Sequence, residues 1–136
     1  MVAKEFCAKA LVAGSHGTTF GGNPFVTTVS LATLTTMLED KLPERSDRVG
    51  SYLAARLRDM AGRRPEIKEV RGKGLLVGIE LDRPAGPIVQ GCRDRGLLLL
   101  TAGDQILRMT PPLVIDEADA DRALSILEAA LGGGKG

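Results

Sequence analysis

The chain has 136 residues, of which 43% are hydrophobic and 26% are charged, and its formal net charge is +1. This length and balance are typical of a compact globular domain and exclude a largely disordered chain. Acidic and basic residues alternate without a dense basic stripe, so nucleic acid is not an expected partner. No apolar run approaches the roughly 18 residues of a membrane span, and the N-terminus lacks a signal-peptide core. We therefore expect a cytoplasmic protein that does not contact a membrane.

Residues that commonly form metal or nucleophilic sites are sparse. Cys7 and Cys92 lie far apart and form no CxxC unit, which favours two reduced thiols. His16 is the only histidine, and a single histidine without further ligands supports neither a metal site nor a catalytic triad. We predict no metal and assign no catalytic residue to this chain.

Glycine and proline divide the first part of the chain. A short helix is expected over residues 5–11, and the glycines of residues 14–22 then form a loop. Asn23 is a preferred N-cap and Pro24 suits the first helical position, which predicts a helix over residues 24–41. Its many threonines lower its helix propensity, so we expect burial against other elements to hold it.

The remaining elements follow from apolar spacing. Apolar residues recur every three or four positions in two helices, and they alternate in the expected strands. A glycine pair, Gly72 and Gly74, suggests a bend at the start of the first strand. The predicted elements are helix 43–61 stopped by Gly62, strand 67–81, helix 86–95, strands 97–100 and 106–109, and helix 116–131. This order predicts an α/β protein of the α+β two-layer kind, with helices on a small, mostly antiparallel sheet preceded by a long helix.

The most informative motif is the glycine-rich loop that leads into the first long helix. Backbone N–H groups at a helix N-terminus, together with the hydroxyls of Thr18 and Thr19, are suited to binding an anion such as phosphate. From the residues alone, a flexible glycine loop with an N-cap is the favoured explanation of the pattern.

The sequence His-Gly-Thr-Thr-Phe-Gly-Gly-Asn-Pro at residues 16–24 resembles the signature loop of the class-III pyridoxal-phosphate-dependent aminotransferases, most closely their acetylornithine branch. The resemblance implies that the loop reaches across a homodimer into the partner's active site. There Thr19 would hydrogen-bond the phosphate of the cofactor, and Thr18 would lie beside the substrate.

Two further segments extend the resemblance. Residues 70–81 resemble the family's Val-Arg-Gly-x-Gly-Leu-x-x-Gly strand, and residues 106–115 resemble its Leu-Arg-x-x-Pro-Pro-Leu segment. In that segment the arginine, Arg108 here, would hold the carboxylate of a small amino-acid substrate, a role that suits the forked guanidinium. The pattern alone favours a surface or ion-paired arginine.

The resemblance also implies what lies elsewhere in a full-length enzyme. The Schiff-base lysine, the aspartate that pairs with the pyridine nitrogen, and the aromatic residue over the ring all precede the loop in the family. Lys9 superficially matches the family's lysine motif, but too few positions separate it from Thr19. We therefore expect a C-terminal portion whose N-terminal large domain is missing. Pyridoxal phosphate would bind in the full-length enzyme and not to this chain alone.

On this basis residues 1–42 are the end of the large domain with its linking helix, 43–131 a small C-terminal domain, and 132–136 a flexible tail. The expected reaction moves an amino group between N-acetylornithine, or a similar ω-amine, and 2-oxoglutarate in arginine biosynthesis, with the chain inactive alone. Two alternatives stay open. One is a non-catalytic assembly or ligand-binding module, and the other is a fragment of an ornithine or 4-aminobutyrate aminotransferase.

Overall fold

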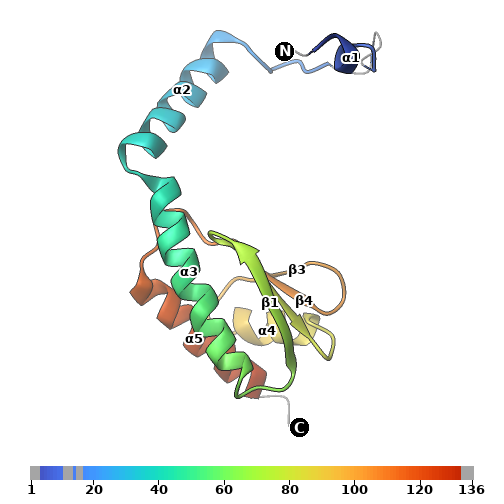
Figure 1. The fold of residues 1–136 in the computed structure, drawn as a ribbon, viewed down its shortest axis with the longest axis vertical. Helices are drawn as coiled ribbons and strands as arrows, with labels where there is room; N and C mark the ends of the chain where they lie inside the picture. The colour runs from blue at the N-terminus through green and yellow to red at the C-terminus, as the bar shows by residue number, and fades with distance from the viewer. Residues whose placement is uncertain (1–3, 11–13, 15–16, 133–136) are drawn as a thin grey trace. The chain divides into compact units, whose positions relative to one another are not determined.

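The computed structural model describes residues 4–10, 14 and 17–132. They belong to two units, Met1–Thr36 and Met37–Gly136. His16, Leu11 and the tail from residue 133 onward lie outside the described residues, and the division at residue 42 stays a prediction. The elements are α1 Glu5–Ala8, α2 Pro24–Glu39, α3 Leu42–Ala61, β1 Ile67–Lys73, β2 Leu76–Leu81, α4 Gly86–Arg93, β3 Leu100–Thr101, β4 Ile106–Met109 and α5 Glu117–Gly132 (Figure 1). No described helix is long and apolar enough to cross a membrane.

The start of α2 follows the prediction. The helix begins at Pro24, and the side-chain oxygen of Asn23 accepts a hydrogen bond from the amide of Val26 at 2.9 Å, as an N-cap does. The expectation that burial holds this helix is not met within the described residues, because none of its side chains is buried.

The sheet of the second unit is antiparallel throughout, with the strand order β1-β2-β4-β3. The prediction of a single strand over residues 67–81 is wrong, because β1 and β2 form a hairpin that turns at Gly74 and Leu75. Gly74 has a φ of 53°, a left-handed conformation that glycine adopts without strain. Gly74 therefore marks a turn inside the segment and not a bend at its start, and Gly72 is a paired residue of β1. Similarly, β3 has only two residues, where a strand over 97–100 was expected.

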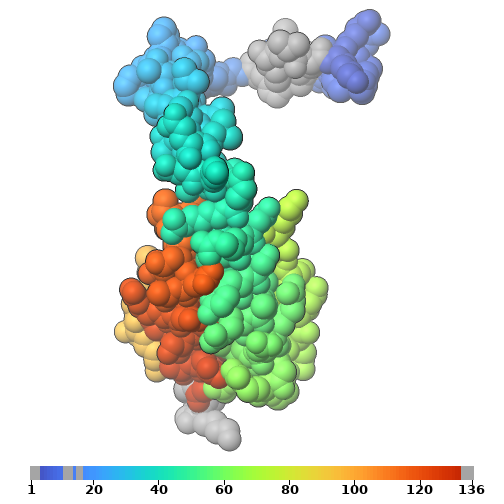
Figure 2. All heavy atoms as spheres, turned by 60° about the vertical axis from the view of Figure 1, so that its left-hand side comes forward, coloured from blue at the N-terminus to red at the C-terminus, as the bar shows by residue number. Residues whose placement is uncertain are grey.

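Three helices cover one face of this sheet. α3 and α5 pack side by side, and Figure 2 shows them as neighbouring green and orange-red ridges. Alternate strand residues point into the core beneath these helices. No described helix of the second unit covers the other face of the sheet. The largest fully buried side chains are Val49, Leu53, Leu57, Val77, Ile79, Leu81, Cys92, Leu107 and Leu127. This core fixes the positions of β4 and of the segments that flank it.

Candidate functional site

Arg108 lies on the sheet face opposite the helices. Its neighbours in β4, Leu107 and Met109, are 0% and 4% exposed, so strand alternation directs Arg108 outward. Across the sheet it stands opposite Gly78 of β2 on one side and Leu100 of β3 on the other. The core packing of β4 therefore determines which way the predicted substrate-binding arginine points.

A second arginine shares this face but differs in its pairing. Arg71 of β1 also stands opposite Gly78, and its guanidinium is 2.6 Å from a Glu69 oxygen and 2.7 Å from a Glu80 oxygen. Its hydrogen bond to Glu80, and then the charge of Glu69, raise the pKa of Arg71 above its ordinary value. Among the described residues Arg108 has no such carboxylate partner, so its guanidinium remains available to an anion.

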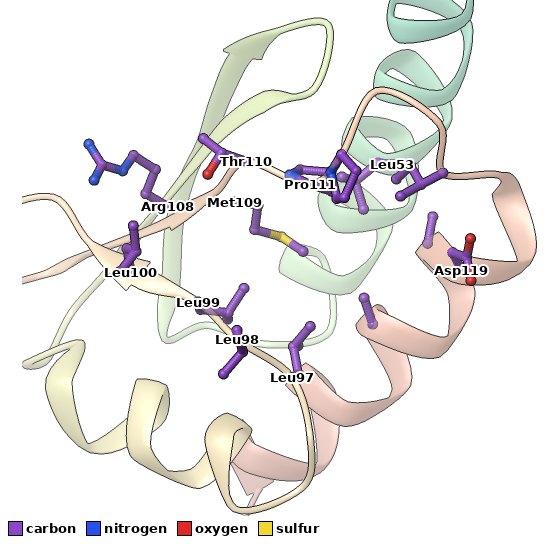
Figure 3. A pocket seen from close by; sticks show the side chains of 14 residues that line it. Leu53, Leu97, Leu98, Leu99, Leu100, Arg108, Met109, Thr110, Pro111 and Asp119 are labelled. Atoms are coloured by element: carbon purple, nitrogen blue, oxygen red, sulfur yellow. The ribbon is translucent and has the colours of Figure 1, made fainter.

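A pocket of about 620 Å³ opens beside Arg108. Figure 3 shows the leucine segment 97–100 along one side, with Met109 and Pro111 across from it. Arg108 and Asp119 occupy opposite ends of the pocket in this view. The full lining is Leu53, Leu97, Leu98, Leu99, Leu100, Arg108, Met109, Thr110, Pro111, Pro112, Ile115, Asp119, Ala120 and Ala123.

The two charged ends of the pocket are not equivalent. The amide of Asp119 donates to a carboxylate oxygen of Asp116 at 2.9 Å, and the Asp119 carboxylate lies 3.6 Å from Arg122. Asp119 therefore belongs to the start of α5. The described lining offers apolar walls and one unpaired guanidinium, and it contains no Cys, His or Lys. Such a pocket can bind and orient a carboxylate with an apolar body, but it supplies no nucleophile of these kinds.

The sequence indicated Arg108 as a site residue but did not indicate that Leu97 to Leu100 line a pocket beside it. The run Leu97 to Leu100 predicts a strand, but only Leu100 belongs to one; Leu98 is 80% exposed, and Leu99 is the buried leucine of the run. The run itself could have indicated this exposure. Successive side chains of a strand point to opposite faces, so four consecutive leucines cannot all face the core.

The Gly-Thr-Thr loop has a defined local structure from Gly17 onward. The Thr18 hydroxyl accepts a hydrogen bond from the Gly21 amide at 3.1 Å, and a Cβ on Gly21 would lie 2.2 Å from Thr18 Cγ2. Thr19 is exposed, and its hydroxyl has no hydrogen-bond partner in the part of the chain that is described. Asn23 already caps the amide of Val26, so the start of α2 retains fewer unpaired N–H groups for an anion than the sequence suggests.

The predicted site residues lie in two units, each described by itself. Thr18 and Thr19 belong to the first unit and Arg108 to the second. Tyr52 is half-buried on α3, and its hydroxyl donates to Asp121 at 2.9 Å.

The amino-acid sequence matches a known protein family over a range that contains both the Gly-Thr-Thr loop and Arg108. The family profile described as class-III aminotransferase matches residues 1–131. An ornithine aminotransferase from Exiguobacterium is 44% identical over 87% of this chain and 29% of its own length. An acetylornithine aminotransferase from Methanothermobacter thermautotrophicus is 37% identical over 93% of this chain and 33% of its own length.

Solved structures agree with these relatives. The acetylornithine aminotransferase from Elizabethkingia anophelis matches 91% of this chain and 32% of its own length, with a TM-score of 0.79 and 30% identity. The ornithine δ-aminotransferase from Plasmodium falciparum matches 96% of this chain and 35% of its own length, with a TM-score of 0.83 and 29% identity. The chain belongs to the class-III aminotransferases, a pyridoxal-phosphate-dependent family, and it spans about a third of the length of these relatives.

Proposed function

We propose that this chain is the C-terminal part of an ornithine- or acetylornithine-type transaminase, which exchanges an amino group between an ω-amine and 2-oxoglutarate. The observation that supports this most directly is the class-III match over residues 1–131, which contains both the Gly-Thr-Thr loop and Arg108. Relatives named for ornithine and for acetylornithine support the two substrates equally. A role in arginine biosynthesis and a place in the cytoplasm are part of the same proposal.

The residues present fit one edge of a pyridoxal phosphate site. Thr19 offers an exposed hydroxyl, and Thr18 keeps its own proton to donate while its oxygen accepts from Gly21. In the proposed homodimer, Thr19 would bond the phosphate in the partner's site and Thr18 would lie beside the substrate there. When bound, the cofactor would supply the electron sink that amino transfer requires.

Arg108 has a separate role in this proposal. Its planar guanidinium would grip the substrate carboxylate through two parallel hydrogen bonds, and the apolar wall of the adjacent pocket would contact the body of the substrate. The pairing of Arg71 with Glu69 and Glu80 leaves it as a weaker competitor for the same carboxylate.

We infer that the chain has no transaminase activity by itself, because the family's covalent lysine is expected in a large domain outside these residues. The test is a chimera in which residues 1–131 replace the matched region of the Exiguobacterium ornithine aminotransferase. We expect the chimera to bind pyridoxal phosphate and turn over ornithine or acetylornithine with 2-oxoglutarate. Comparing these amines with 4-aminobutyrate identifies the substrate. Turnover by the isolated chain, or a folded chimera without activity on any of the three amines, would contradict the proposal.

A further inference from the structure

The strand β2 has a glycine, Gly78, at a position where the sheet does not require one. Gly78 is in register on both sides, opposite Arg71 of β1 and Arg108 of β4. Its φ lies outside the left-handed region, so other residues can adopt its backbone conformation. Glycine in the interior of a strand loses more conformational entropy than other residues and has no side chain to pack. The backbone therefore gives no reason for a glycine here.

The surrounding chain also has room for a side chain at this position. A Cβ built on Gly78 would have Ile106 Cγ2 as its nearest atom at 3.6 Å and Arg71 Cγ at 3.9 Å, which are ordinary contact distances. Gly72 of β1 differs, because its φ is 153° and its Cβ would lie 2.1 Å from the carbonyl oxygen of Leu76. The fold of this chain therefore requires glycine at position 72 but not at position 78.

The space beside Gly78 opens on the sheet face that carries Arg108. Val77 and Ile79 are 1% and 0% exposed, so strand alternation directs the position of the missing side chain outward. Of the two arginines opposite Gly78, Arg71 is paired with carboxylates and Arg108 is unpaired among the described residues. Because an available guanidinium borders this space, an anion is the occupant that it favours.

We propose that Gly78 is a further binding position of the substrate site: its missing side chain leaves the space through which the substrate carboxylate reaches Arg108. A glycine inside a strand often marks a place where a ligand or another backbone approaches closely. A carboxylate accounts for both the missing side chain and the unpaired guanidinium, whereas a packed backbone accounts only for the first. The inference rests on the proposed function, because it takes 2-oxoglutarate as the source of the carboxylate.

The test compares Gly78→Val with Gly78→Ala in the chimera described above. We expect Gly78→Val to raise the KM for 2-oxoglutarate at least about tenfold with little change in kcat, because a blocked approach removes a hydrogen bond to a charged group. Gly78→Ala adds only a methyl group for which there is room, so the rise should be smaller. Leu76→Val is the matched control, since it places valine on the same strand and face, where Leu76 is 58% exposed. It should leave the KM unchanged.

Thermal unfolding separates a binding role of Gly78 from a structural one. Neither substitution should lower the Tm of the isolated chain or of the chimera, because space is available and valine has a higher strand propensity than glycine. A Tm lowered by Gly78→Val in the isolated chain would show a packing role within this chain. A Tm lowered only in the chimera would show that the large domain fills the space. Either result overturns the proposal.

Kinetics can overturn it as well. The proposal is wrong if Gly78→Val leaves the KM for 2-oxoglutarate unchanged. It is also wrong if Arg71→Ala raises this KM as much as Gly78→Val does, because displacement of the neighbouring Arg71 would then explain the effect.

Calorimetry distinguishes this inference from the proposed function. When 2-oxoglutarate is titrated into the chimera without an amine, Gly78→Val should weaken binding at least about tenfold relative to the parent. A parent chimera that binds 2-oxoglutarate but turns over none of the three amines contradicts only the proposed function. Equal binding by the Gly78→Val variant and the parent contradicts only the role of Gly78. A parent chimera that does not bind 2-oxoglutarate contradicts both.

Discussion

The backbone of Gly50 in α3 lies directly against that of Gly74 in the β1–β2 turn: a Cβ built on Gly50 would stand 2.1 Å from the Gly74 carbonyl oxygen. The turn is held there from the same helix, because the Ser46 hydroxyl accepts a hydrogen bond from the Leu75 amide at 3.2 Å. This contact is backbone against backbone, so no side-chain rotation can relieve an added methyl group.

We expect Gly50→Ala to destabilise the chain by about 1–3 kcal/mol, the usual cost of overpacking. The better helix propensity of alanine works in the opposite direction, by about 1 kcal/mol, and does not offset the clash. Urea unfolding measures the difference. Gly62→Ala is the control, because Gly62 ends α3 with a φ of −61° and has room for a Cβ. Equal stability of the two variants would contradict the contact.

Thr19 is proposed to act in the partner's cofactor site, which mixed dimers can test. One chimera carries Thr19→Ala, and a second lacks the cofactor lysine of its large domain. If Thr19 acts across the dimer, a mixed dimer combines both defects in one site and leaves the other site intact. Mixing the two inactive or weakened chimeras should therefore restore up to half of the activity per dimer. If mixing yields no recovery although mixed dimers form, Thr19 acts within its own subunit.

Arg108 is proposed to bind the substrate carboxylate. We expect Arg108→Ala in the chimera to raise the KM for 2-oxoglutarate by about 10- to 150-fold, because a hydrogen bond to a charged group contributes roughly 1.5–3 kcal/mol. Arg108→Lys should recover only part of the loss, since lysine keeps the charge but not the fork. Steady-state kinetics of both variants provide the measurement.

The control for Arg108 is Arg71→Ala, because Arg71 lies on the same sheet face but is paired with Glu69 and Glu80. It should leave the KM for 2-oxoglutarate unchanged. An equal rise in KM for the Arg71 and Arg108 variants would show that general charge on this face, and not a specific carboxylate contact, attracts the substrate.

Tyr52 offers a pH-dependent test of the α3–α5 interface. Its hydrogen bond to Asp121, with burial as the second cause, raises the pKa of Tyr52 above its ordinary value. A raised pKa in the folded state means that its contribution to stability is present below the unfolded pKa of about 10 and is lost as pH rises through the folded pKa. Because Tyr52 is the only tyrosine, tyrosinate absorbance reports this group alone.

We expect the alkaline titration midpoint of Tyr52 to fall in Asp121→Ala. Asp59→Ala, which removes an exposed carboxylate elsewhere on α3, should leave the midpoint where it is. In urea all three proteins should titrate alike. A midpoint that is the same in the folded Asp121→Ala variant and in the parent would rule out the hydrogen bond as the main cause.

Part of the fold could be predicted because its signals are local. Asn23 and Pro24 mark a helix start through their own backbone preferences, and the structure starts α2 at Pro24. The spacing of Val49, Leu53 and Leu57 likewise predicts α3, and these residues are buried. The class-III family could be predicted for the same reason, because its motifs are short runs of adjacent residues.

Other features depend on residues far apart in the chain. Nothing local distinguishes the hairpin turn at Gly74 from a bend in one strand, because the choice depends on which residues pair across the sheet. The leucines beside Arg108 could not be predicted to line a pocket. Only the folded chain brings residues 97–100 and β4 to the same pocket.

The sequence by itself thus determined the start of α2, the class-III family and the choice of Thr18, Thr19 and Arg108 as candidates, because each rests on neighbouring residues. Only the tertiary structure decided that Arg71 forms ion pairs with Glu69 and Glu80, while Arg108 is unpaired among the described residues. In the sequence alone, Arg71 and Arg108 cannot be distinguished, because each is a charged residue within a predicted strand. Strand register brings carboxylates to one and an open pocket to the other, and register is set by the packing of the whole core.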